Sequence, residues 1–382
     1  MPLIRLDTSR ANPVAAWARR LALEVWLLGV LLLGFALVPT AARAQSQSAG
    51  SSALQPGALL RAGLQIEPDE SDRNSGFTIF DAQASLRGDV GGVFSYFTRV
   101  DVDFDDPTIR LLDARFDATI IPEARIGVGL FRPAFGLEAL TDEVDFTFAR
   151  RSQASEAIAP GRQVGAELFG DALEGRLTYG AGMSNGNGPT LENDDNRFLY
   201  AARAQFNTIG PIEFYDEMVL QFGASVAYSK DTDAELGPGL ITPPPTPDLF
   251  PIFEPTGFAG ERFLWGVDFH STYRGFALTA EYLSGNFDPE EQGGPEIDGQ
   301  RAYGGYVEAG WRGLGLFEGV VRYDGFHPVE GENRDYLVFG VNIFPGSYAK
   351  MFGIQYAVKL HGSPPAPTIA GNQLILLGQI DF

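Results

Sequence analysis

The chain has 382 residues, no cysteine and 46 glycines, and aromatic residues make up 12% of it. Without cysteine it forms neither disulfides nor thiolate metal sites, and the glycine and aromatic content favours a sheet protein with many turns over a helical one. Acidic residues outnumber basic ones by 49 to 28, a formal net charge of -21, which excludes the broad basic surface that nucleic acid requires.

The first 44 residues differ in composition from the rest of the chain. Arginines precede an apolar run over 25–38, and the small-x-small pattern ARA stands just before Gln45. This order predicts a signal peptide over 1–44, because the apolar run is too short for a transmembrane helix. We therefore expect an exported protein, with a short N-terminal lead over 45–57.

From residue 58 onward, apolar and polar residues alternate in repeated stretches. For example, Phe94, Tyr96 and Val100 alternate with Ser95 and Arg99. Period two indicates a strand with two different faces, and most stretches are 9 to 12 residues long, the length of a tilted membrane-crossing strand. Sixteen such stretches are predicted, over 58–67, 77–87, 93–104, 109–118, 124–132, 162–169, 173–183, 197–207, 218–229, 262–273, 276–284, 302–312, 316–324, 335–344, 350–361 and 373–382.

The connections between these stretches alternate in length. Those after odd-numbered stretches are mostly long and those after even-numbered ones mostly short, with 105–108 and 208–217 as exceptions. This is the pattern of outer loops and periplasmic turns in a membrane barrel. Aromatic pairs at both ends of a stretch, such as Phe94 with Phe104, favour interfacial girdles over a soluble sandwich. Because a sheet in lipid must be fully paired, the fold predicted over 58–382 is an all-β, 16-stranded antiparallel transmembrane β-barrel with a water-filled lumen.

The last stretch ends on an aromatic residue. Phe382, Ile380 and Leu376 continue one apolar face to the final position, so the last strand is expected to close the barrel, with Phe382 at its rim. A terminal aromatic in this pattern also resembles the signal read by the outer-membrane barrel-assembly machinery. That machinery and outer-membrane lipid are the predicted partners, and the bacterial outer membrane is the predicted location.

One stretch, 129–170, carries a family motif, GLFRPAFGLEALTDEVDFTFARRSQASEAIAPGRQVGAELFG. Its FGLE run begins at Phe135, and its PGR run at Pro160 is followed by Gly165. These features, with Phe131, Pro133 and Arg151-Ser152, resemble the phosphate-selective porin O and P family. The resemblance implies a homotrimer of sixteen-stranded barrels whose third outer loop folds into the pore. In the count of connections above, 133–161 is the third outer one.

The connection 133–161 has the composition of a constriction loop. It carries apolar residues that an open loop would leave in water, and folding against the inner wall would bury them. Arg150, Arg151 and Arg162, with Arg132 beside them, would then shape the narrowest section. Guanidinium matches phosphate and carboxylate geometry, and rings of arginine select anions. The other interpretation is that these arginines pair with acidic residues of the same loop and only fix its position.

The polar faces of the strands mix both signs of charge, so the fold carries over from the resemblance but phosphate selectivity does not. The predicted function is passive diffusion of small hydrophilic solutes, with anions such as phosphate as candidates, and no cofactor is implied. The residues predicted to line the pore are Arg61, Arg87, Arg99, Arg115, Arg203, Asp101 and Asp103.

Other chemistry has weaker support in the sequence. A calcium loop starting at Asp101 would need glycine and glutamate where Asp106 and Leu112 stand, so no metal site is predicted. A lipase-like outer-membrane enzyme needs a histidine beside a nucleophile. The three histidines show no such arrangement, so no catalytic residue is predicted either. A structural or adhesive barrel with a closed lumen has only the long loops in its favour.

Overall fold

The computed structural model describes residues 54–67, 75–104, 108–189, 192–193, 195–208, 218–234, 240, 258–289, 300–313, 315–329, 332–345, 350–362 and 372–382. The predicted signal peptide lies outside these residues. Within them, no helix is long and apolar enough to cross a membrane, a finding that does not bear on β-barrels.

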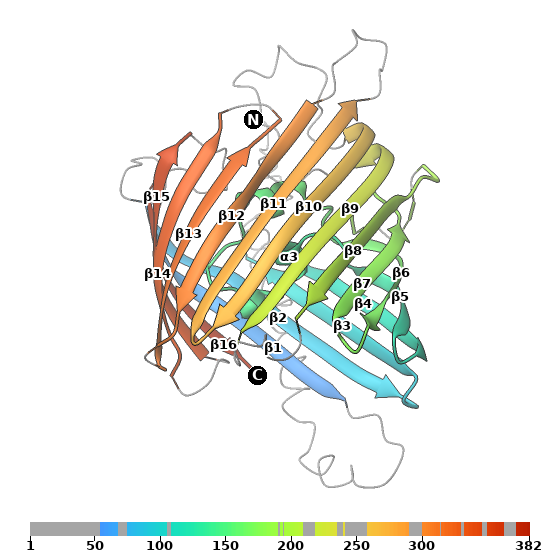
Figure 1. The fold of residues 1–382 in the computed structure, drawn as a ribbon, viewed down its shortest axis with the longest axis horizontal. Helices are drawn as coiled ribbons and strands as arrows, with labels where there is room; N and C mark the ends of the chain where they lie inside the picture. Colours follow the sequence, from blue (N-terminus) through green and yellow to red (C-terminus); the bar gives the residue numbers. More distant parts are fainter. Residues whose placement is uncertain are drawn as a thin grey trace, which may run out of the picture.

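Sixteen strands form one closed barrel, in which each strand pairs with its sequence neighbours and β1 pairs with β16 (Figure 1). Every pair is antiparallel, as β1 with β16 and β9 with β10 illustrate. The predicted 16-stranded antiparallel barrel is thus confirmed. The strands are β1 Gln55–Ile66, β2 Gly76–Val90, β3 Phe94–Asp103, β4 Thr108–Ile121, β5 Ala124–Phe131, β6 Gln163–Ala172, β7 Leu177–Ser184, β8 Leu199–Asn207, β9 Val219–Ala234, β10 Phe258–Tyr273, β11 Phe276–Pro289, β12 Gln300–Trp311, β13 Phe317–His327, β14 Arg334–Ile343, β15 Lys350–His361 and β16 Gln373–Asp381.

The two ends of the chain close the barrel. Strands β1 and β16 pair from Leu59 with Asp381 to Ile66 with Leu374. Beyond the last strand residue, the Phe382 N–H donates to the Ala58 carbonyl at 3.1 Å, and the Ala58 N–H donates to the Phe382 carbonyl at 2.8 Å. The terminal aromatic therefore takes part in closure at the rim, as expected.

The two faces of the sheet differ in polarity, as the alternation predicts. On the outer face, Phe116, Phe222 and Phe352 are each about half exposed, at 48, 51 and 58%. On the inner face, charged side chains such as Arg61 and Glu281 are buried. Exposed apolar residues on the outside with polar ones inside is the arrangement of a barrel surrounded by lipid.

Three local features differ from the predicted stretches. The stretch 173–183 was placed too early, because Leu173, Glu174 and Gly175 have positive φ angles of 54°, 59° and 82° and form the turn before β7. Bulges also change the face on which residues lie. In the pairing of β3 with β4, Leu112 has no partner residue on β3. In the pairing of β1 with β2, Phe80 has no partner residue on β1. Hydrophobic alternation carries no information on φ, which is why the turn was missed.

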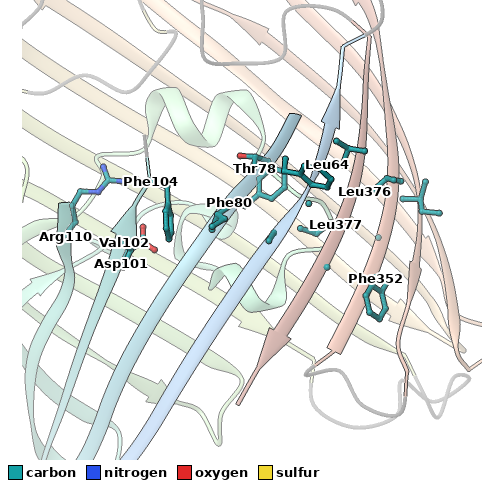
Figure 2. A pocket seen from close by; sticks show the side chains of 17 residues that line it. Leu64, Thr78, Phe80, Asp101, Val102, Phe104, Arg110, Phe352, Leu376 and Leu377 are labelled. Carbon is teal, nitrogen blue, oxygen red and sulfur yellow. The ribbon is translucent and has the colours of Figure 1, made fainter. Parts of the chain in front are cut away.

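A hollow of about 1060 Å³ lies along β15, β16, β1, β2 and β3 (Figure 2). The pairing of β2 with β3 starts only at Gln83 and Asp101, so the earlier part of β2 lacks β3 as a partner. Leu64 and Leu376 line the hollow on the β1 and β16 side, and Phe104 on the β3 side. Its lining is mostly apolar, which fits a wall region in contact with lipid.

Close backbone contact at the seam between β1 and β16 gives a test of closure. A Cβ atom added to Gly63 would lie 2.0 Å from the Leu376 carbonyl oxygen. Gly63→Val is therefore expected to destabilise the barrel by about 1–3 kcal/mol, the usual range for overpacking. The measurement is the urea midpoint of the refolded protein in detergent. Gly319→Val is the control, since a Cβ atom there meets nothing within 4 Å, and an equal loss in both variants would contradict the argument.

Candidate functional site

Between β5 and β6 the chain forms a compact segment, residues 132–162, with short helices. It contains α3 (Leu137–Leu140), the 3-10 helix η1 (Glu143–Asp145) and α4 (Gln153–Ile158). The Ser152 hydroxyl caps α4 by accepting the Ser155 N–H. Most of the apolar side chains of the segment are buried, including Phe135 and Phe148. α4 packs against β11, β12 and β13.

Backbone N–H groups of the segment donate to acceptors on strands. The N–H groups of Leu137 and Glu138 donate to the Glu281 carboxylate of β11 at 2.6 and 3.1 Å. The Ala149 N–H donates to Gln355 Oε1 of β15 at 2.8 Å. These buried acceptors satisfy backbone groups that would otherwise lose their hydrogen bonds to water.

Strand side chains also donate to carbonyls of the segment. Arg61 of β1 donates to the carbonyls of Phe148 and Ala149 at 3.1 and 3.0 Å. On the other side, the Gly136 N–H donates to the Ser225 hydroxyl of β9 at 3.1 Å. Strands β1 and β9 are eight apart in a ring of sixteen. The segment therefore contacts opposite walls of the barrel, and Figure 1 shows it between the front and rear strands.

The four arginines predicted to shape the constriction lie around one cavity of about 330 Å³. Arg132, Arg150, Arg151 and Arg162 all line it, and Glu156 is the one acidic residue among its lining residues. The structure thus brings together residues that are up to 30 positions apart in the sequence. Four guanidinium groups against one carboxylate make this cavity strongly cationic.

Two carboxylates outside the cavity lining pair with three of these arginines. Glu143 accepts from Arg132 and, at 3.1 Å, from Arg151. Asp113 of β4 accepts from Arg162 at 3.2 Å. Arg132 and Arg151 thus pair with an acidic residue of their own loop, as the second interpretation predicts, whereas Arg162 pairs with a residue of a strand.

Arg150 is bonded differently from its neighbours. Its Nη2 donates to the Gln65 amide oxygen at 3.1 Å, and its guanidinium lies 5.5 Å from the centre of the Phe80 ring. Its buried Nε has no hydrogen-bond partner among the described residues. Gln65 and Phe80 carry no charge, and Glu156 of the same cavity is the carboxylate whose pKa Arg150 acts to lower.

The crowding of charge shifts pKa values in the segment. Burial and the neighbouring Arg151 lower the pKa of Arg132, and burial and Arg132 lower the pKa of Arg162. Burial acts to raise the pKa of Glu143, but Arg132, Arg151 and Arg162 outweigh it and hold that pKa well below its usual range. Burial raises the pKa of Glu156. The neighbouring arginines thus act against one another's charged forms, and Glu143 is the carboxylate whose charged form they stabilise.

Arg132 also lines a second cavity, of about 350 Å³, on the other side of α3. Arg115, Arg125 and Arg203 line it too, together with Glu167. The buried Arg115 Nη2 and Arg125 Nε have no hydrogen-bond partner among the described residues. The two cavities therefore share Arg132 and place arginines on both sides of it.

Most residues predicted to line the pore form ion pairs on the inner face. Arg61 pairs with Asp81 at 2.8 Å, Arg99 with Asp113 at 2.7 Å, Arg115 with Glu167 at 2.7 Å and Arg203 with Asp268. Arg87 is exposed and lies 5.0 Å from the centre of the Phe97 ring. Asp101 accepts the Ala82 N–H at 3.1 Å. The Asp103 side chain lies outside the described part of the chain.

Sequence reasoning missed the pairing of Arg322 with Glu138. Arg322 donates to Glu138 at 2.8 Å and to Glu308 at 2.6 Å, and it also donates to the Arg150 carbonyl at 3.3 Å. Arg322 belongs to β13, and Glu138 lies 184 residues away in the sequence. No local pattern predicts a contact of that separation.

The model of the family described as phosphate-selective porin O and P matches residues 62–342. The chain belongs to the phosphate-selective porin O and P family. It is an outer-membrane porin, a barrel for the passage of small solutes, and the predicted resemblance is confirmed. No curated relative matches the chain.

Solved porin structures share the fold of this porin at low sequence identity. The anion-selective porin from Comamonas acidovorans has a TM-score of 0.60 and 11% identity, and the match covers 87% of this chain and 100% of that one. The trimer form of OmpT from Vibrio cholerae has a TM-score of 0.58 and 10% identity, and the match covers 87% of this chain and 100% of that one. The outer-membrane channel DcaP of Acinetobacter baumannii has a TM-score of 0.55 and 11% identity, and the match covers 88% of this chain and 99% of that one. At these identities the likeness concerns the fold.

Proposed function

We propose that this porin favours small anions, and that residues 133–161 are the loop that constricts its pore. The observation that carries the proposal is the cavity lined by Arg132, Arg150, Arg151 and Arg162 with one carboxylate among its lining residues. Fixed cations at a narrow section attract anions and repel cations. Phosphate and carboxylates are the matching solutes, because guanidinium donates to both in a planar, two-pronged geometry.

The structure supports a constriction in two ways. The segment contacts opposite walls of the barrel through β1 and β9, and its arginines lie on the inner side of the wall. The second cavity continues the positive charge beyond Arg132, because Arg115, Arg125 and Arg203 also line it.

The proposal also covers the location, export and assembly of the barrel. Family membership and the similar structures point to the bacterial outer membrane. We infer export through the signal peptide 1–44, insertion by the barrel-assembly machinery guided by Phe382, and assembly as a homotrimer. The trimer form among the similar structures supports the last of these.

The test is the reversal potential of the refolded porin in a planar bilayer under a gradient of potassium chloride, then of potassium phosphate. The wild type is expected to favour anions. In the triple variant Arg150→Ala, Arg151→Ala and Arg162→Ala, the anion-to-cation permeability ratio is expected to fall by roughly tenfold, about 1.4 kcal/mol. Arg274→Ala, in the exposed turn after β10, removes a charge far from the cavity and is expected to leave the ratio unchanged.

Three results would count against the proposal. Cation preference in the wild type would mean that the acidic residues of the inner face dominate. An unchanged ratio in the triple variant would place the selective section elsewhere. A protein without conductance would be a closed structural barrel. The absence of enzymatic chemistry stays a prediction, to be checked by replacing His270, His327 and His361 and assaying lipid hydrolysis.

A further inference from the structure

Glu281 of β11 is a buried carboxylate that binds the segment 132–162 with both of its oxygens. Oε1 accepts the Leu137 N–H at 2.6 Å, and Oε2 accepts the Glu138 N–H at 3.1 Å. Oε2 also accepts the Ser155 hydroxyl of α4 at 3.3 Å. Gly136, with a φ of 75°, allows this close approach, since a Cβ atom there would lie 3.2 Å from Oε1. One carboxylate of the wall therefore holds both α3 and α4.

The wall around Glu281 supplies no cation to it. Its partners across the sheet are Asp268 of β10 and Tyr306 of β12. The charge of Asp268 is balanced by Arg203 of β8, whose guanidinium donates to it at 2.9 Å. Neither of the two neighbouring strands therefore places a positive charge on the Glu281 carboxylate.

The segment neutralises Glu281 no more than the wall does. Glu138 of α3 is itself negative, and Arg322 of β13 donates to it at 2.8 Å. Within the described ranges, the hydrogen-bond donors to Glu281 are two backbone N–H groups and the Ser155 hydroxyl, and none of these carries a charge. Hydrogen bonds from the segment thus stabilise a buried negative charge. In return, that charge fixes the start of α3.

The other end of α3 binds two arginines of the first cavity. The carbonyl of Thr141, the residue after α3, accepts from Arg132 at 3.3 Å and from Arg151 at 2.9 Å. The Glu138 carbonyl also accepts from Arg151, at 3.3 Å. α3 is a single turn of helix, Leu137–Leu140, so a shift at its start is transmitted to these carbonyls. The guanidinium groups of Arg132 and Arg151 would then lose their orientation.

α3 also separates the two arginine cavities. Ala139 lines the first cavity, whereas Leu137 and Leu140 line the second. Arg132 lines both. The position of this one turn therefore sets the shape of both cavities, and Glu281 is the strand carboxylate that accepts its first N–H groups.

We propose that Glu281 is a positioning residue for anion selection: its ionised carboxylate holds α3, and α3 holds Arg132 and Arg151. The inference rests on the proposed anion function. An ionised carboxylate accepts with both oxygens, whereas an amide or a protonated carboxyl group turns a donor toward one of the two N–H groups. Loss of the charge therefore releases the start of α3. A role in positioning and a role through charge alone have opposite signs, because a negative charge near a pore by itself favours cations.

The test is the anion-to-cation permeability ratio of the full refolded porin in a planar bilayer under a potassium chloride gradient. In Glu281→Gln the ratio is expected to fall by about threefold, the effect of one weakened hydrogen bond. A rise in the ratio would mean that Glu281 acts only through its charge, and would overturn the proposal. Asp231→Asn is the matched control. It removes another buried carboxylate of the inner wall, one that pairs with Arg262 at 2.8 Å, and is expected to leave the ratio unchanged.

The pH dependence of the ratio separates the ionised carboxylate from the side chain as such. Other acidic groups titrate in both proteins, so the difference between wild type and Glu281→Gln isolates Glu281. That difference is expected to narrow as the pH is lowered from about 7 to about 4, where glutamate takes up a proton. A difference that stays constant over this range would overturn the role of the charge in positioning.

A second measurement reports the position of α3 without reference to selectivity. The chain has no cysteine, so Ala139→Cys places a single thiol on α3 at the first cavity. Adding Glu281→Gln is expected to raise severalfold the rate at which 2-sulfonatoethyl methanethiosulfonate labels this thiol. Adding Asp231→Asn is expected to leave the rate unchanged. An unchanged rate with Glu281→Gln would overturn the proposal.

The outcomes distinguish this inference from the proposed function. An anion-selective wild type with an unchanged ratio in Glu281→Gln would overturn the role of Glu281 and leave the proposed function intact. A wild type without anion preference would overturn the proposed function, and with it the role of Glu281 in selection. If Glu281→Gln fails to refold, Glu281→Asp replaces it. This variant keeps the charge but is one methylene shorter, and the ratio is expected to fall in the same direction; a wild-type ratio would overturn the proposal.

Discussion

Replacing Arg322 with methionine is expected to release the segment 132–162 and to destabilise the barrel by about 3–5 kcal/mol, the range seen when one partner of a buried ion pair is removed. The Arg322 side chain is 6% exposed and bonds Glu138 of the segment and Glu308 of β12. Its guanidinium also lies 4.5 Å from the Phe148 ring and 4.6 Å from the Tyr306 ring. Without it, the buried carboxylate of Glu138 and the partly buried one of Glu308 remain with no cation between them.

The measurements are the urea midpoint in detergent and the single-channel conductance. Conductance is expected to rise and to become noisier, because Arg322 also holds the Arg150 carbonyl at 3.3 Å. The variant Glu138→Gln, Arg322→Met, Glu308→Gln removes the orphaned charges and is expected to recover much of the lost stability. A single Arg322→Met variant with wild-type midpoint and conductance would show that the segment is held by its other contacts alone.

The barrel could be predicted from the sequence because the pattern that defines each strand lies within a short stretch of the chain. Each strand has a lipid face and a lumen face, so period two is visible in any window of about ten residues. The seam between β1 and β16 followed from the alternation that runs to Phe382. Bulges at Phe80 and Leu112 were not predicted, because a skipped residue alters pairing while leaving composition unchanged. Strands β9 and β11 end several residues later than predicted, and β10 begins several residues earlier, where the apolar pattern fades.

The site was predicted less completely, for a related reason. Arginines at 132, 150, 151 and 162 were selected by their place in one loop, and the structure gathers them around one cavity. Which carboxylate each arginine meets depends on how the loop crosses the barrel. Pairing with an acidic residue of the same loop, as Glu143 shows, was one of the two interpretations, whereas Asp113 of β4 became a partner through tertiary structure alone.

Glu143 is the centre of charge balance in the arginine cluster, and Glu143→Gln is expected to change stability and selectivity in opposite directions. The carboxylate accepts from Arg132, Arg151 and Arg99, the last two at 3.1 and 3.4 Å. Burial works against its ionisation, yet the arginines hold its pKa far below the usual value. The variant should lose about 2–4 kcal/mol of stability at neutral pH. Its anion preference should increase, since the arginines would lose a counter-ion.

The sign of the pH dependence follows from the depressed pKa of Glu143. A carboxyl group with a lowered folded pKa contributes stability that is fully present above its unfolded pKa, about 4.3 for glutamate. That contribution is lost as the pH falls toward the folded value. Urea midpoints of wild type and Glu143→Gln should therefore differ most at about neutral pH, and the gap should narrow steadily as the pH falls below about 4.3. Asp89→Asn, an exposed change at the end of β2, should follow the wild type throughout. A gap between wild type and Glu143→Gln that stays constant down to low pH would mean that the side chain acts through packing and not through its charge.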